Sequence, residues 1–278
     1  MNTRSETSDP FGDTDTEDTG LSGLFEPMPL PPLRRQALRA GLPERVARSV
    51  AEHSGLITIR ARHGAWHSLK PGIRYKPLWS GPEGNSVLIE FAAGTRLPIH
   101  RHRWLEEGIV LRGDLYMGEL CLGRYDYHVS PVGSRHGRIG SRGGALAYLR
   151  GTSLGDTVSV LGEMLGGFLP HAGPPARTVF ASDNGWETVA PGVARKRLWS
   201  DARMASYFFR LAPGAEVAGH EHPLDEECIM LEGDVFLGDI LLGVGEYQVA
   251  PAGTRHGLAH SDSGALLYVR GARETFGE

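Results

Sequence analysis

Two stretches of the chain carry the same set of potential metal ligands. One reads GTRLPIHRHRWLEEGIVLRGD from Gly94 to Asp114, and the other reads GAEVAGHEHPLDEECIMLEGD from Gly214 to Asp234. In each stretch two histidines stand one residue apart, a pair of glutamates follows, and a further histidine comes later in a PxGxRHG segment. The candidate metal ligands recur at a constant offset of 120 residues: His100, His102, Glu106 and His136, then His220, His222, Glu226 and His256.

These residue types at this spacing indicate a transition-metal centre. Residues two apart in a strand point to the same face, so both histidines of each pair can aim into one interior. Three imidazoles and one carboxylate suit Fe, Zn or Mn, whereas Ca and Mg prefer shells made of oxygen. A lone histidine pair would also fit a polar surface. The complete set in both stretches favours metal binding, with up to two ions per chain.

A second acid, Glu107 or Glu227, adjoins each candidate ligand glutamate. Neighbouring residues of a strand point to opposite faces, so one acid of each pair should face the metal and the other should not. Spacing alone leaves open which of the two it is.

The ligand sets lie within a tandem duplication. Residues 66–151 align with residues 186–271 without a gap, and 35 of the 86 positions are identical. Short apolar runs in each unit are broken by glycine every eight to ten residues, which is typical of a β-sandwich or barrel. We therefore predict an all-β protein with two domains, at residues 59–160 and 181–278. An irregular Gly/Pro-rich linker is expected at residues 161–180.

The segment before the repeats has two parts. Residues 1–26 hold seven acids and one base, and this composition predicts a disordered acidic tail. Residues 27–58 predict a helical arm of two short helices broken at Gly41. Leu42, Val46 and Val50 share one face of the second helix. That face should pack on the main domain or on a second subunit, or else bind a partner.

Composition excludes several classes of protein. The 278 residues carry a net charge of −4, so nothing favours nucleic-acid binding. The N-terminus lacks the apolar core of a signal peptide, and no apolar run approaches the length of a membrane span. The two cysteines, Cys121 and Cys228, build neither a disulfide framework nor a CxxC zinc pattern. A cytoplasmic protein is expected.

The motifs resemble those of the cupin superfamily. The run from Gly94 to Gly113 is similar to its first motif, and Pro131, Gly133 and His136 are similar to its second. More closely, the HxHxxxEExxxLxG run, the PxGSRH segment and the closing YLRG resemble the ChrR-type cupin. This resemblance implies two tandem double-stranded β-helix (jelly-roll) barrels, with Glu106 and Glu226 as the carboxylate ligands. The second motif usually opens with a glycine, which Gly245 supplies and Tyr125 replaces in the first unit.

The resemblance implies two functions. One is a non-heme metal-dependent dioxygenase that acts on a small chelating substrate such as a diketone or hydroxyketone. In that enzyme Glu106 and Glu226 would also serve as catalytic bases. The other is a ChrR-like sensor that binds zinc or a small ligand and regulates a sigma factor. The sensors hold a zinc with a histidine and a CxxC pair upstream of the cupin, and this chain has no cysteine there.

The surroundings of the two ligand sets predict unequal pockets. Arg101, Arg103 and Trp104 stand where the second unit has Glu221, Pro223 and Leu224. Such a difference would let one of the two sites serve a purely structural role. Cupin barrels often pair by strand exchange, so either a homodimer or pairing of the two barrels within one chain is expected.

Overall fold

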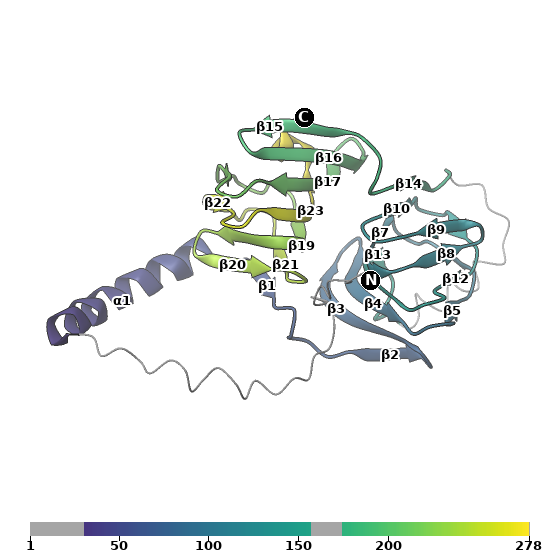
Figure 1. Ribbon diagram of the computed structural model, residues 1–278, viewed down its shortest axis with the longest axis horizontal. Helices are drawn as coiled ribbons and strands as arrows, with labels where there is room; N and C mark the ends of the chain where they lie inside the picture. The colour runs from purple at the N-terminus through teal and green to yellow at the C-terminus, as the bar shows by residue number, and fades with distance from the viewer. Residues whose placement is uncertain (1–30, 157–173, 278) are drawn as a thin grey trace, which may run out of the picture.

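The chain folds into two β-barrels that lie side by side (Figure 1). The computed structural model describes residues 31–156 and 174–277, apart from the side chains of Glu52 and His136. The described part has one α-helix, α1 (Pro32–Glu52), and a short 3-10 helix, η1 (Arg273–Phe276). All other regular elements in it are strands, which confirms the predicted fold class. The expected acidic tail, residues 1–26, lies outside the described residues.

Each barrel is built from one repeat. The first repeat supplies β2 (His67–Lys70), β3 (Ile73–Gly81), β4 (Gly84–Phe91), β5 (Arg96–Leu97), β6 (His100–Arg101), β7 (Glu106–Gly113), β8 (Leu115–Met117), β9 (Leu120–Leu122), β10 (Tyr127–Ser130), β11 (Arg135–His136), β12 (Ile139–Gly140) and β13 (Ala145–Thr152). The second repeat supplies β15 (Trp186–Ala190), β16 (Val193–Ser200), β17 (Met204–Leu211), β18 (Glu216–Val217), β19 (Glu226–Leu237), β20 (Ile240–Gly243), β21 (Tyr247–Ala250), β22 (Ala259–His260) and β23 (Ala265–Ala272).

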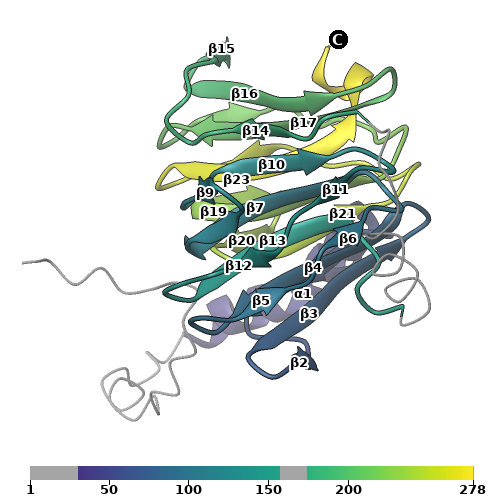
Figure 2. The same ribbon diagram turned by 90° about the vertical axis from the view of Figure 1, so that its right-hand side faces the viewer.

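The barrels exchange one strand each. Strand β1 (Ile57–Ile59) precedes the first repeat, yet it pairs antiparallel with β21 of the second. Strand β14 (Arg177–Val179) precedes the second repeat, yet it pairs antiparallel with β10 of the first. The resulting strand orders, β14-β10-β7-β13-β4-β3-β2 and β1-β21-β19-β23-β17-β16-β15, correspond strand for strand (Figure 2).

This exchange corrects two expectations drawn from composition. The segment predicted as an irregular linker, residues 161–180, ends in β14, and the predicted helical arm, residues 27–58, ends in β1. Both segments are polar or Gly/Pro-rich, and their strands are only three residues long, so local pattern was too weak to predict them. Residues 161–173 of the linker lie outside the described residues.

Strand alternation divides the buried side chains into three cores. One face of each large sheet lines its own barrel, where Val87 and Ile89 pack in the first barrel and Met230 and Val269 in the second. The other faces meet between the barrels and form a shared core. Apart from Tyr125, its members come in pairs 120 residues apart, such as Tyr148 and Tyr268, both fully buried.

The N-terminal helix differs from its prediction. Gly41 does not break it, and α1 runs through both Gly41 and Pro43 for 21 residues. A glycine costs a helix only about 1 kcal/mol relative to alanine, which flanking Ala, Leu and Arg residues can offset.

The apolar face of α1 is open in the described part of the chain. Leu42, Val46 and Val50 are each more than half exposed. The helix projects from the second barrel (Figure 1), where Ser49 Oγ and His53 Nε2 bond to Asp239 Oδ1 at 3.1 and 2.6 Å.

Candidate metal centre

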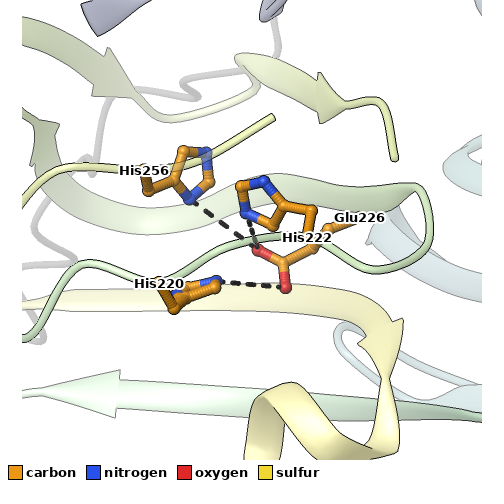
Figure 3. Close-up of side chains that lie close together, drawn as sticks. All are labelled: His220, His222, Glu226 and His256. Atoms are coloured by element: carbon orange, nitrogen blue, oxygen red, sulfur yellow. Dashed lines mark ion pairs between the residues drawn. The ribbon is translucent and has the colours of Figure 1, made fainter. Parts of the chain in front are cut away.

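The second barrel brings all four of its predicted ligands together. His220, His222, Glu226 and His256 each offer a ligand atom, and these atoms lie within 4.8 Å of one another (Figure 3). Glu226 Oε2 lies 3.5 Å from His220 Nε2, and Oε1 lies 3.6 Å from His222 Nε2 and 3.9 Å from His256 Nδ1. Glu226 begins β19, and the loop before it carries both histidines of the pair.

Hydrogen bonds outside the cluster direct two imidazole lone pairs into it. Thr254 Oγ1 donates to Pro251 O at 2.6 Å, so it accepts from His222 Nδ1–H at 3.1 Å. Gln248 Oε1 accepts from His256 Nε2–H at 2.9 Å. These bonds leave the lone pairs of His222 Nε2 and His256 Nδ1 facing Glu226. Partners of this kind orient histidines for metal binding.

The buried cluster contains polar atoms that a metal ion would satisfy. His220 Nε2, His222 Nε2 and Glu226 Oε2 are buried and make no hydrogen bond to the described part of the chain. Buried polar atoms without partners are costly, so such a group calls for an explanation. Three imidazole nitrogens and a carboxylate fit a divalent transition metal. The residues present therefore fit the ion that their sequence pattern predicts.

The protonation states of the cluster also suit metal binding. Burial acts to raise the pKa of Glu226, but the neighbouring His220 and His222 outweigh it and lower that pKa to about 2. Burial lowers the pKa of His256 to about 4. At neutral pH the carboxylate is ionised and His256 is neutral, which are the forms that coordinate metals.

The first barrel assembles three of its four predicted ligands among the described side chains. His100, His102 and Glu106 form the cluster, with His102 Nδ1 3.6 Å from Glu106 Oε1. His100 Nδ1 donates to Pro98 O at 3.1 Å, which turns the lone pair of Nε2 away from that carbonyl. Burial, with smaller contributions from His100 and His128, lowers the pKa of His102 to about 3, so its imidazole is neutral. The backbone of His136 pairs with His100, but its side chain lies outside the described residues.

Each exchanged strand contacts a polar side chain that lies next to one of the candidate metal sites. Thr58 of β1 accepts from Gln248 Nε2 at 3.0 Å, and Gln248 in turn holds His256. In the first barrel the equivalent positions are Thr178 and His128, whose Oγ1 and Nδ1 atoms lie 2.9 Å apart. The strand that each barrel borrows thus supports the residue behind its site.

The space beside the two clusters differs. In the first barrel, His100 and Glu106 line an interior cavity of about 60 Å³, whose other walls are mainly apolar and include Ile89, Phe91 and Leu149. In the second barrel, Phe276 of η1 packs against the interior core. A Cβ at Gly271 would lie 2.8 Å from Glu226 Oε2 and 3.3 Å from Phe276 Cζ, so Phe276 approaches the cluster across a glycine.

The paired glutamates separate as strand alternation requires. Glu106 and Glu226 face the barrel interiors, whereas Glu107 and Glu227 are buried in the interface between the barrels. The structure thereby answers the question that spacing left open, in favour of the first glutamate of each pair.

The chain belongs to the family of ChrR cupin-like domains. Two copies of this domain match, at residues 54–152 and 175–273. Both matches begin before the first strand of their own repeat and so include the exchanged strands β1 and β14. The fold agrees with this assignment. No curated protein sequence matches the chain.

Several solved structures share the fold at low sequence identity. A candidate dioxygenase from Nostoc punctiforme matches with a TM-score of 0.60 and 16% identity, over 78% of this chain and 82% of that one. A mutant of Bacillus subtilis oxalate decarboxylase matches with a TM-score of 0.54 and 16% identity, over 77% and 76%. The pirin YhhW of Escherichia coli, in complex with nickel(II), matches with a TM-score of 0.55 and 12% identity, over 78% and 98%. The shared architecture is thus that of two-barrel cupins.

Two groups of residues escaped sequence reasoning. His128 and Gln248 occupy one repeat position but differ in type, so identity between the repeats did not mark them. Arg150 and Arg270 are identical, but the closing YLRG motif in which they lie gives no indication of a contact partner. Strand alternation puts each arginine on the same face of its strand as Tyr148 or Tyr268, but it does not reveal the glutamate that the arginine meets on another strand. Within the described residues, no helix is long and apolar enough to cross a membrane.

Proposed function

We propose that the protein is a metal-dependent enzyme of the dioxygenase type, and that the first barrel binds the substrate. The observation that carries this proposal is the apolar cavity that His100 and Glu106 line. A volume of about 60 Å³ holds about four to six water-sized groups. It therefore suits a small molecule such as a short diketone or hydroxyketone. The fold that the chain shares with a candidate dioxygenase is consistent with this proposal.

The residues of the first barrel have separate tasks in this proposal. His100, His102 and Glu106, with His136, would hold an iron or manganese ion, which supplies Lewis acidity and redox chemistry when bound. The carboxylate of Glu106 lines the cavity, where it can accept a proton from the carbon between two substrate carbonyls. The apolar walls exclude water, which strengthens electrostatic interactions within the cavity. Dioxygen is the oxidant that cleaves the substrate carbon–carbon bond.

Metal analysis combined with oxygen uptake tests this function. Untagged protein, purified without added metal, should contain about two transition-metal ions per chain by plasma mass spectrometry, as the two clusters imply. Protein loaded with Fe(II) should consume oxygen when pentane-2,4-dione is added, and Glu106→Gln should abolish that uptake. The matched variant Glu226→Gln should retain most of it. Full metal content without oxygen uptake, across a panel of small diketones and hydroxyketones, would refute the enzyme.

A sensor is the second candidate, and one link in the structure favours it. Helix α1 leads into β1, whose Thr58 holds Gln248, and Gln248 holds the candidate ligand His256. Metal occupancy of the second barrel could thus act on the helix through this strand. A pull-down with full-length protein should then recover a sigma factor in a zinc-dependent manner. Recovery unaffected by chelation would remove the role of the metal.

A further inference from the structure

A cleft between the two barrels has the features of a second ligand site, separate from both metal clusters. Its volume is about 860 Å³, and both repeats and Pro174 line it. Trp79, Trp104 and Trp199 contribute aromatic walls, and Arg150 and Arg270 stand among the lining residues. Arg203 also lines the cleft, as do four carboxylates, those of Glu83, Asp201, Asp225 and Glu227. The two buried arginines beside an apolar wall can nevertheless receive the charged end of an amphipathic anion.

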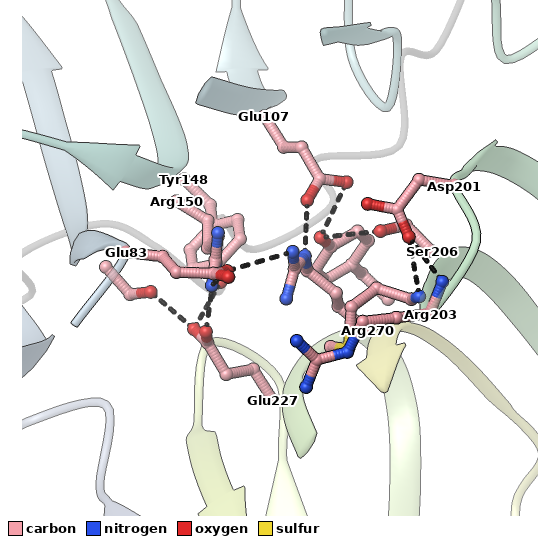
Figure 4. Close-up of polar contacts among 12 residues, drawn as sticks. Glu83, Glu107, Tyr148, Arg150, Asp201, Arg203, Ser206, Glu227 and Arg270 are labelled. Atoms are coloured by element: carbon pink, nitrogen blue, oxygen red, sulfur yellow. Dashed lines mark hydrogen bonds and ion pairs between the residues drawn. The ribbon is translucent and has the colours of Figure 1, made fainter. Parts of the chain in front are cut away.

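The two arginines are held firmly by the interface core. Arg270 Nε donates to Glu107 Oε2 at 2.8 Å, and Arg150 Nε donates to Glu227 Oε1 at 3.2 Å (Figure 4). Each glutamate also accepts from two tyrosines, and Glu227 accepts from Ser86 as well. The guanidinium positions are therefore fixed before any ligand arrives, which is the preorganisation that binding requires.

A single carboxylate of the chain bridges the outer nitrogens of both arginines. Glu83 Oε2 lies 2.9 Å from Arg150 Nη2 and 3.5 Å from Arg270 Nη2. Burial acts to raise the pKa of Glu83, but Arg150 outweighs it and holds that pKa below its usual range. Glu83 therefore occupies, as an anion, the point on which the two cations converge.

Glu83 is suited to leave that point. It stands in the two-residue turn between β3 and β4, and its side chain is 56% exposed. Its repeat partner is Arg203, so the second barrel offers no matching carboxylate. Meanwhile Arg150 Nη1 is buried without a hydrogen-bond partner in the described part of the chain. Arg150 thus has donor capacity that Glu83 does not use.

We propose that the cleft binds a small carboxylate with an apolar or aromatic body, and that the ligand carboxylate displaces Glu83 from Arg150 and Arg270. Glu107 and Glu227 already balance the two arginines, so exchanging one carboxylate for another leaves the net charge of the buried cluster unchanged. The tryptophans receive the rest of the ligand. Leu105 and Leu224, on the loops that carry the metal-ligand histidines, also line the cleft. A bound acid would therefore contact the loops of both metal sites.

Binding of benzoate to the full-length protein tests this site, with benzamide as its neutral counterpart. Isothermal titration and quenching of tryptophan fluorescence should both show saturable binding of benzoate. Benzamide should bind at least about tenfold more weakly, because it lacks the charge-assisted hydrogen bonds. Glu83→Gln should tighten benzoate binding about tenfold, because an internal competitor reduces apparent affinity by the fraction of sites it occupies.

Two further variants keep the result unambiguous. Glu119→Gln removes the same charge from an exposed turn of the first barrel and should leave benzoate affinity as in the wild type. Arg270→Lys, with folding checked by circular dichroism, should weaken binding because a lysine cannot reproduce the guanidinium fork. Benzoate bound to a metal would be indifferent to Glu83. Equal affinity in the wild type and Glu83→Gln, equal binding of benzamide, or no saturable binding in Glu83→Gln would each overturn the proposal.

Discussion

The two barrels have the same arrangement of strands but surround their candidate metal-ligand clusters differently. Strand order, the exchanged strand and the buried layer between the barrels correspond position by position. Inside, the first barrel holds a cavity beside His100 and Glu106, whereas in the second Phe276 packs near Glu226. The residue that supports the third histidine is Gln248 in the second barrel, and its repeat equivalent in the first is His128.

This difference indicates where the duplicated halves were free to diverge. The interface layer is shared, so a change in one half also alters the packing of the other. Its glutamates and arginines, and the two tyrosines that bond to each glutamate, are identical in both halves. Each barrel interior is its own, so side chains around the ligands could change without disturbing the partner barrel. The proposed function assigns a division of labour to this difference, with substrate binding in the first barrel and a more enclosed candidate metal site in the second.

The shared layer provides the largest expected effect. Glu107→Gln and Glu227→Gln should each lower the free energy of unfolding by about 3–5 kcal/mol, because each leaves a buried arginine without its carboxylate. Chemical denaturation followed by fluorescence measures both. Glu83→Gln serves as the control and should cost less than about 1 kcal/mol, since Glu83 is largely exposed. If only one of the two substitutions lowered the free energy of unfolding, the two halves of the interface would contribute unequally to stability despite their matching geometry.

The contribution of Glu227 to the stability of the protein should also depend on pH. Burial acts to raise the pKa of Glu227, but Arg150 and the hydroxyl donors outweigh it and hold that pKa below its usual range. The stabilisation from Glu227 is therefore complete above the unfolded pKa and is lost as pH falls through the lower folded value. Glu227→Gln should accordingly flatten the acid limb of the stability profile. A variant with the acid limb of the wild type would show that other carboxylates control acid unfolding.

The metal clusters provide the next effect. His100→Ala and His220→Ala should each remove about one metal equivalent per chain, as plasma mass spectrometry would show. Only His100→Ala should also lower oxygen uptake with a diketone, by more than about 100-fold. Loss of a metal ligand should lower activity more than loss of a residue that only supports a ligand. His220→Ala should reduce uptake far less. Equal losses of activity in the two variants would contradict the division of labour.

Gln248 orients the third histidine of the second cluster, and its substitution should have a smaller effect that is confined to one barrel. Gln248→Leu removes the acceptor for His256 Nε2–H and should weaken one of the two metal sites about 10–100-fold. Competition with a coloured chelator would resolve the weakened site from the unchanged one. Thr178→Val removes the partner of His128 in the first barrel and should leave the second site unaltered. Uniform weakening of both sites by Gln248→Leu would mean that the barrels are coupled.

Sequence reasoning reached the ligands because their spacing is a property of the local chain. The HxH pair and the following glutamate span seven residues, from a loop or short strand into the strand that begins at the glutamate, and the duplication presents that pattern twice. The exchanged strands were missed because β1 and β14 are each three residues long and owe their pairing to the opposite repeat. The arginine layer was missed for a related reason. Arg150 donates a hydrogen bond to Glu227, which lies 77 positions later in the sequence. No local sequence pattern predicts a contact between residues so far apart.

Tyr125 shows how a departure from the motif can be explained only in three dimensions. It replaces the glycine that Gly245 supplies in the second repeat, and it keeps the left-handed backbone, with φ of 66° against 77°. A non-glycine residue there costs about 1–2 kcal/mol. Tyr125 Oη donates to Leu231 O of the other barrel at 2.9 Å, and the ring is buried in the shared core. The contact across the interface offsets the backbone strain.

Removing that hydroxyl therefore gives the smallest expected effect. Tyr125→Phe keeps the ring and the backbone but leaves Leu231 O without this donor, so unfolding free energy should fall by about 1 kcal/mol. The matched change Gly245→Ala adds a side chain at a positive φ in the second barrel and should cost about 1–2 kcal/mol. Both can be measured by denaturation under the same conditions. Tyr125→Phe could instead leave the free energy of unfolding unchanged while Gly245→Ala lowers it. Burial of the ring alone would then offset the backbone strain at Tyr125, and the hydrogen bond between the barrels would contribute nothing.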